Sequence, residues 1–166
     1  MPVNVVEANV WDIACRDVPV AHCVSADFAL GAGFAQDVAN RYPSIRRSLR
    51  EQTANMTPPE RVGRSWSFRG PDGQVVYNLA TKRRYFERAD RDPQPNADTL
   101  ARALRELRRQ SDDAEHTHIV MPKIGSGLDR MPWSRTFDIL EHVFEGFPLV
   151  TVCELAHARR SFPGAL

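Results

Sequence analysis

Two short glycine loops constrain the fold of this chain more than any other feature. Gly31-Ala32-Gly33 and Gly125-Ser126-Gly127 each follow an apolar segment and precede a helical pattern, and together they hold four of the nine glycines. Glycine lets bare backbone approach a ligand closely, and the first N–H groups of a helix have no partners within that helix. Each loop is therefore suited to receive a phosphate. The pair predicts a diphosphate held between the two loops.

Segments typical of strands and helices alternate along the chain. A glycine-containing turn at 70–73 joins two strands into an antiparallel hairpin. The alternation predicts a three-layer α/β/α fold, in which helices cover both faces of a mixed, mostly parallel sheet. We expect one domain over residues 1–155 and a poorly ordered tail over 156–166. The expected strands are 3–11, 18–25, 66–69, 74–81, 116–121 and 147–155, and the expected helices are 34–39, 44–51, 100–107 and 137–144, with a loop at 92–96.

Composition excludes several functional classes. An apolar fraction of 42% supports one core, and a net charge of +1 argues against a broad nucleic-acid-binding surface, although a nucleic-acid substrate stays open. No apolar run is long enough to span a membrane, and the first residues lack the features of a signal peptide. The chain is therefore expected to be soluble and cytoplasmic. Cys15, Cys23 and Cys153 show no CxxC spacing and are expected to be free thiols.

Several familiar motifs are incomplete. Neither glycine loop completes GxGxxG or carries GK[ST], so the dinucleotide and P-loop motifs are not matched. His116 and His118 form an HxH pair without a third ligand at motif spacing, and we expect no metal site and no cofactor. His22 and Cys23 are neighbours on one predicted strand and should face opposite sides of the sheet. That placement argues against a cysteine nucleophile.

Lysine is rare in this sequence. Of 22 Lys and Arg residues, only Lys82 and Lys123 are lysine. Arginine cannot lose its proton and act as an amine nucleophile, whereas lysine can. The sequence leaves open whether the two lysines are present by chance or serve a chemical role.

Three blocks of the sequence combine strand ends with the two glycine loops. They are Ala21-His22-Cys23-Val24-Ser25-Ala26-Asp27 continuing to Ala35, Tyr77-Asn78-Leu79-Ala80-Thr81-Lys82-Arg83, and Met121-Pro122-Lys123-Ile124-Gly125-Ser126-Gly127-Leu128-Asp129-Arg130. Together these blocks resemble the macrodomains, an α/β family that binds ADP-ribose. In particular they resemble the subgroup that contains the terminal ADP-ribose protein glycohydrolase and the macrodomain of the DNA ADP-ribosylglycohydrolase antitoxins. The resemblance covers about residues 5–155.

The resemblance implies a catalytic pair, Lys82 in a Thr-Lys motif and Asp129 in a Gly-Leu-Asp motif. Two departures concern the adenosine end of the ligand. Ala8-Asn9 replaces the family's Gly-Asp, so that an amide oxygen stands where a carboxylate accepts from adenine, and Cys153 replaces an aromatic residue. The implied ligand-binding residues are Asn9, Val10, Ser25, Gly31, Ala32, Gly33, Thr81, Lys123, Ile124, Gly125, Ser126, Gly127, Leu128 and Leu155.

The implied function is hydrolysis of an N- or O-glycosidic ADP-ribosyl linkage by a monomeric enzyme in DNA or protein repair, or in an antitoxin-like role. Its partners would be ADP-ribose and ADP-ribosylated protein or DNA, with the modification on an acidic side chain or on a base. This chemistry suits Lys82 and Asp129, because an amine can attack the oxocarbenium-like C1″ while a carboxylate donates and accepts protons as general acid and base. Two alternatives stay open: a non-catalytic reader of ADP-ribose, and a phosphatase acting on ADP-ribose-1″-phosphate.

Overall fold

The computed structural model describes residues 1–82, 93–124 and 131–155. A six-stranded sheet with the order β1-β6-β5-β2-β4-β3 forms its centre. Adjacent strands are parallel except β3, which pairs antiparallel with β4. The strands are β1 (Val3–Glu7), β2 (Val20–Ser25), β3 (Arg64–Arg69), β4 (Val75–Lys82), β5 (His118–Pro122) and β6 (Leu149–Glu154), and the helices are α1 (Val10–Ile13), α2 (Gly33–Arg41), α3 (Ile45–Gln52), α4 (Pro58–Arg61), α5 (Pro93–Asp113) and α6 (Trp133–Val143).

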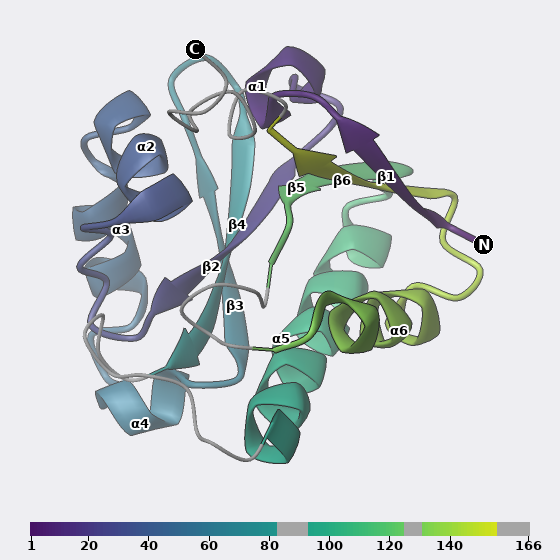
Figure 1. Cartoon of the computed structure of the whole chain (residues 1–166). Coiled ribbons are helices and arrows are strands. Elements are labelled where there is room, and N and C mark those ends of the chain that lie inside the picture. The colour runs from purple at the N-terminus through teal and green to yellow at the C-terminus, as the bar shows by residue number, and fades with distance from the viewer. Residues whose placement is uncertain (83–92, 125–130, 156–166) are drawn as a thin grey trace, which may run out of the picture.

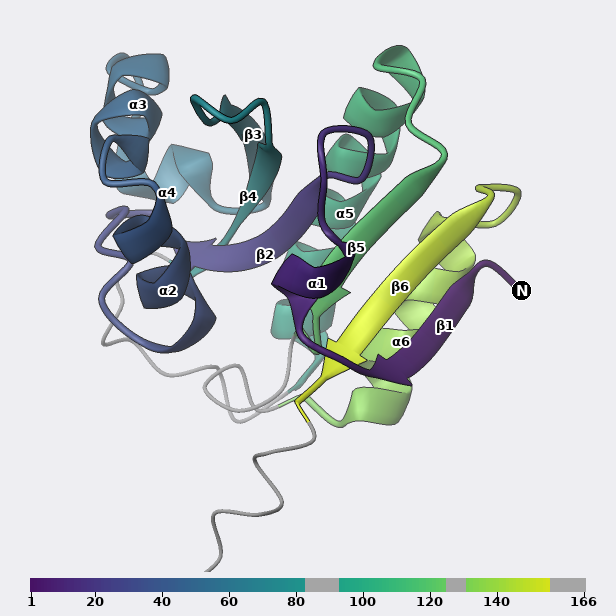
Figure 2. The ribbon, with the colours of Figure 1, turned by 90° about the horizontal axis from the view of Figure 1, so that it is seen from above.

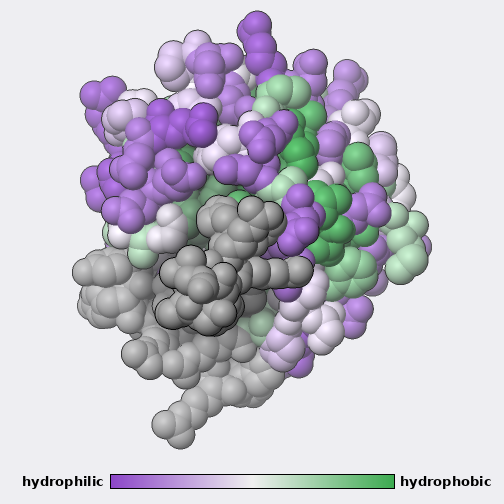
Figure 3. Space-filling view, turned by 45° about the horizontal axis from the view of Figure 1, so that its top comes forward, coloured by the Kyte–Doolittle hydropathy of each residue, from purple (hydrophilic) through white to green (hydrophobic). Residues whose placement is uncertain are grey.

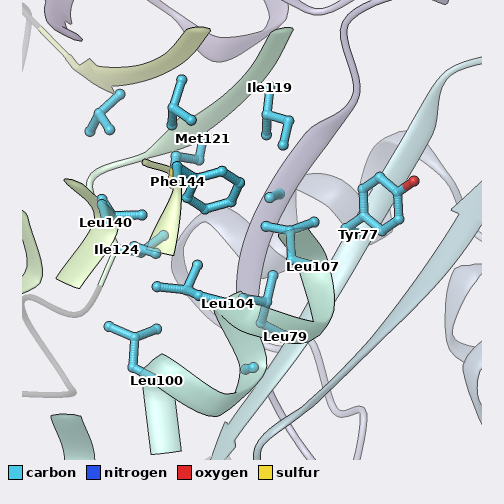
Figure 4. Close-up of a cluster of buried hydrophobic side chains, with 14 of the residues drawn as sticks. Tyr77, Leu79, Leu100, Leu104, Leu107, Ile119, Met121, Ile124, Leu140 and Phe144 are labelled. Carbon is cyan, nitrogen blue, oxygen red and sulfur yellow. The ribbon is translucent and has the colours of Figure 1, made fainter. Parts of the chain in front are cut away.

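Helices cover both faces of this sheet, as Figures 1 and 2 show. On one face, α5 and α6 bury an aliphatic and aromatic core against the sheet. Figure 4 shows how Leu104 and Leu107 of α5 meet Ile119 and Met121 of β5 in this core. On the other face, α1, α2 and α3 bury a second cluster. The predicted three-layer arrangement is confirmed.

The helical periodicity explains why α5 packs on the sheet. Leu100, Ala103, Leu104 and Leu107 recur on one face and are almost completely buried. A similar division holds for α3, where Ile45 and Leu49 are buried and the outward side chains are charged. Figure 3 shows hydrophilic side chains covering the side of the molecule on which α2 and α3 lie. None of the helices within the described ranges is long and apolar enough to cross a bilayer.

Two predicted segments differ from the structure for local reasons. The first strand ends at Glu7, because the Asn9 side chain caps a short helix by accepting from the Trp11 N–H at 3.0 Å. The segment predicted as a loop at 92–96 lies largely in α5, which begins at Pro93. Proline is tolerated there because the first N–H groups of a helix have no intrahelical acceptor.

The hairpin between β3 and β4 is formed as predicted. Gly73 adopts a φ of +86°, and its N–H donates to the Gly70 carbonyl oxygen at 2.9 Å. The Asp72 carboxylate accepts from the Gln74 N–H at 3.0 Å and from the Tyr42 hydroxyl at 2.8 Å. The turn is therefore fixed both by its own backbone and by the end of α2.

Candidate functional site

The carboxyl ends of five parallel strands lie along one edge of the sheet. The last residues of these strands are Glu7, Ser25, Lys82, Pro122 and Glu154. In open α/β sheets, ligands bind in the crevice beyond the carboxyl ends of the strands. Each segment predicted to bind ligand ends or follows one of these strands, so the fold gathers them along one edge.

Lys82 is fixed at this edge through its backbone. Its carbonyl oxygen accepts from the Ala26 N–H at 2.7 Å, and an irregularity in the register pairs Lys82 with Ser25. The side chains of Lys82 and Thr81 are half-buried. None of the ion pairs between described residues includes Lys82. The structure thus places the end of β4 directly beside the loop that follows β2.

The loop that follows β2 is held in an unusual backbone conformation. Phe28 and Leu30 have φ values of +53° and +44°, and Gly33, at the start of α2, has +58°. Such φ values are unfavourable for residues other than glycine. Burial of the Phe28 and Leu30 side chains holds them there. The Asp27 carboxylate further supports the loop by accepting from the Ser25 hydroxyl at 2.6 Å and from the Ala29 N–H at 3.1 Å.

Two arginines that the sequence interpretation missed contact this same loop. Arg46 of α3 donates to the carbonyl oxygens of Ala29 and Leu30, and Arg61 of α4 donates to that of Ala26. Gly31, Ala32 and Gly33 remain exposed. No local pattern distinguishes these two arginines from the other arginines of the chain, so only the folded arrangement identifies them.

The predicted adenosine end of the site begins at the short helix α1. Val10 is buried, whereas Asn9 is exposed and uses its amide oxygen to cap the helix. Trp11 stacks on Phe34 with 5.6 Å between ring centroids, and its indole N–H donates to Asp37 at 2.9 Å. These contacts fasten α1 to α2.

Lys123, the second lysine, forms an ion pair at the same edge. Its Nζ lies 2.8 Å from a carboxylate oxygen of Glu154 and 5.1 Å from the ring centroid of Trp133. Ile124 is buried, and Leu155 is exposed beyond the end of β6. The contacts of Lys123 suit a binding or structural role. The predicted site residues Gly125, Ser126, Gly127, Leu128 and Asp129 lie outside the described residues.

His22 is buried beneath α2. Its Nε2 and the Asn78 Oδ1 are 2.6 Å apart, and the Asn78 amide nitrogen donates to the carbonyl oxygens of Trp66 and Val76. The Asn78 oxygen therefore accepts, and His22 Nε2 is the donor. Desolvation lowers the pKa of His22 to about 4, against the raising effect of the Asn78 hydrogen bond. His22 is accordingly neutral at physiological pH.

The remaining histidine and cysteine candidates have ordinary structural contacts. His116 lies before β5 rather than in it and shares a hydrogen bond of 3.0 Å with the Tyr77 hydroxyl, while His118 shares one of 2.8 Å with the Thr151 hydroxyl. Cys23 packs in the core formed with α5 and α6, whereas His22 contacts Phe34 of α2. The predicted opposite orientation of His22 and Cys23 is confirmed.

Comparison with known proteins identifies the fold. No protein-family model matches the chain. The chain is 29% identical over 126 residues to the ADP-ribose glycohydrolase OARD1 of Homo sapiens, covering 76% of this chain and 74% of that protein. The macrodomain of Mycobacterium tuberculosis DarG superposes with a TM-score of 0.74 at 16% identity, covering 93% of this chain and 98% of that one. The chain has the macrodomain fold. A second macrodomain structure, that of Thermus aquaticus DarG, matches with a TM-score of 0.73 at 15% identity over 91% of this chain and 96% of its own.

The relatives support the resemblance carried by the three sequence blocks, and the solved structures confirm the predicted α/β/α fold. Within this fold, Ser25, Lys82 and Lys123 all occupy the carboxyl edge of the sheet, together with Asn9 and Leu155.

Proposed function

We propose that this macrodomain binds ADP-ribose and removes mono-ADP-ribose from a modified acceptor, either an acidic protein side chain or a DNA base. One observation carries the proposal: Lys82 stands at the carboxyl end of β4, with its backbone bonded to the loop that follows β2. Similarity to OARD1, which is named as an ADP-ribose glycohydrolase, supports the same activity.

The proposed binding mode uses the whole carboxyl edge. Exposed backbone at Gly31, Ala32 and Gly33, with the loop at 125–128, would receive the diphosphate through N–H groups. Val10 and Asn9 would lie beside the adenosine, and Leu155 would border it. This orientation directs the distal ribose toward Lys82.

In the proposed reaction, the unprotonated Lys82 amine attacks C1″ of the distal ribose. The bond between C1″ and the acceptor atom breaks with its electron pair leaving on the acceptor, and Asp129 supplies the proton. Asp129 then removes a proton from water, which attacks C1″ and displaces the amine. The products are ADP-ribose and the unmodified acceptor, and Lys82 is regenerated.

Substitution of Lys82 tests this role. We expect Lys82→Arg and Lys82→Ala to lower turnover equally, by at least about a hundredfold, because a guanidinium cannot deprotonate to attack. ADP-ribose should still bind both variants. The measurement is single-turnover release of ADP-ribose beside calorimetric affinity, with Arg109→Ala as a control on an exposed face of α5. Near-normal release by Lys82→Arg would reduce the role of Lys82 to electrostatics.

The acceptor is determined with a substrate panel. Wild-type protein is incubated with glutamate-linked, serine-linked and thymidine-linked ADP-ribose and with ADP-ribose-1″-phosphate, and free ADP-ribose is quantified. Release from the glutamate or thymidine linkage supports the proposal and selects the acceptor. Cleavage of the 1″-phosphate alone would indicate a phosphatase. Tight binding of ADP-ribose without any release would indicate a reader.

A further inference from the structure

Arg46 and Arg61 hold the loop after β2 by its carbonyl oxygens. Arg46 donates from Nε to Ala29 O at 2.8 Å and from Nη2 to Leu30 O at 2.9 Å. Arg61 donates from Nη1 to Ala26 O at 2.8 Å and from Nη2 to Thr53 O at 3.2 Å. Both helices that carry these arginines, α3 and α4, lie on the same side of the sheet as α2 (Figure 1). Three carbonyl groups of one short loop are therefore bonded by guanidinium groups.

A hydrogen bond that fixes a carbonyl group also fixes the direction of the N–H in the same peptide group. The structure contains no cis peptide bond among its described residues. In a trans peptide, the carbonyl of one residue and the N–H of the next point in opposite directions. Because Arg46 binds the Leu30 carbonyl, the Gly31 N–H points away from Arg46. Gly31 is exposed, whereas Arg46 is half-buried.

Arg46 also affects how strongly the Gly31 N–H can donate a hydrogen bond. A charge-assisted hydrogen bond polarises the peptide group whose carbonyl accepts it, which makes the N–H on the other side of that group a better donor. The loop needs such support, because Leu30 holds a φ of +44° that a branched residue rarely adopts. The Arg46 guanidinium donates to the Ala29 and Leu30 carbonyl oxygens of this loop, whereas Arg61 also donates to Thr53 at the end of α3.

We propose that Arg46 is a positioning residue for anion binding, which aims the Gly31 N–H at the ligand diphosphate without contacting it, and that Arg61 supports the same loop at Ala26. The proposal rests on the proposed function for the identity of the anion. It adds a residue on α3 to a site otherwise built from strand ends, loops and the first residues of α1 and α2.

The chain offers a matched control on the same helix. Arg47 is adjacent to Arg46, has the same charge and points outward, with 77% of its side chain exposed and only a 4.0 Å pair to Glu51. Removing Arg47 changes the net charge as much as removing Arg46 does, and it leaves the loop untouched. A difference between the two variants therefore reports position rather than charge.

The test measures affinity for three probes: ADP-ribose, inorganic pyrophosphate and adenosine. We expect Arg46→Ala to weaken the binding of ADP-ribose and pyrophosphate at least about tenfold, because the Gly31 N–H is then neither held toward the anion nor polarised by the arginine. Adenosine affinity should be unchanged, and Arg47→Ala should resemble wild type for all three probes. The more conservative Arg46→Gln keeps one donor and should fall between wild type and Arg46→Ala, so it serves if the alanine variant does not fold.

A spectroscopic readout separates positioning from general destabilisation. Pyrophosphate should shift the Gly31 amide resonance in the wild type and in Arg47→Ala, but much less in Arg46→Gln at equal thermal stability. Unchanged pyrophosphate affinity in Arg46→Gln and Arg46→Ala, or an equal loss of adenosine affinity, would overturn the proposal. If wild-type protein binds pyrophosphate at Gly31 but releases no ADP-ribose from any substrate, the proposed function fails and the role of Arg46 stands.

Discussion

His22 links the stability of this protein to pH, because its imidazole is buried in the neutral form. Burial lowers its pKa to about 4 from the ordinary value of 6.5. The unfolded chain therefore binds more protons than the folded chain between these two pKa values. The free energy of unfolding must fall as pH falls through this window. Stability from this group is complete above pH 6.5 and is lost progressively toward pH 4.

The two pKa values set the magnitude. Between pH 7.5 and pH 5.0, this single group should remove about 2 kcal/mol from the free energy of unfolding, and the full loss below pH 4 is about 3 kcal/mol. Such a loss is a large part of the stability of a domain of this size. His116 and His118 also have pKa values lowered by burial, so they contribute in the same direction.

The assay isolates His22 by difference. Urea unfolding is followed by tryptophan fluorescence at pH 7.5 and pH 5.0 for wild type, His22→Gln and His142→Gln. Glutamine removes the titrating group, and His142 is the exposed control on α6. We expect the pH-dependent loss to be about 2 kcal/mol smaller in His22→Gln than in wild type, and unchanged in His142→Gln. Equal pH dependence in all three proteins would refute the assignment of a neutral, desolvated His22.

Two further predictions concern the ligand edge. Gly33→Val should weaken ADP-ribose at least about tenfold by calorimetry, because Gly33 holds a φ of +58° where α2 begins and a β-branched residue would shift that turn. Gly146→Val is the control, because Gly146 has a φ of +82° and, like Gly33, has no atom within 4 Å of an added Cβ. An equal loss of ADP-ribose affinity in Gly146→Val would contradict a local role for Gly33. Asn9→Asp should tighten ADP-ribose about fivefold, because a carboxylate accepts more strongly than an amide while still capping α1. Unchanged or weaker binding would show that no ligand donor reaches this side chain.

Features that depend on short-range pattern could be predicted from the sequence alone. The buried stripe of α5 follows from its apolar spacing, and the hairpin follows from the turn residues between β3 and β4. The position of Lys82 at the end of a strand could be predicted in the same way. Because parallel strands share a carboxyl edge, the gathering of the predicted ligand segments at one edge also followed from the predicted order of elements.

Contacts between segments far apart in the chain required the tertiary structure. The strand order places β6 beside β1 and β2 between β5 and β4, which no local signal specifies. Burial of His22 and its low pKa depend on Asn78, which is 56 residues away. Arg46 and Arg61 resemble any other arginines in sequence, and they act on the loop after β2 only because α3 and α4 fold against it. The physical reason is one of range. Apolar periodicity and turn chemistry act over a few neighbouring residues. The orientation of a peptide group and the desolvation of a side chain depend on distant segments that the fold packs against them.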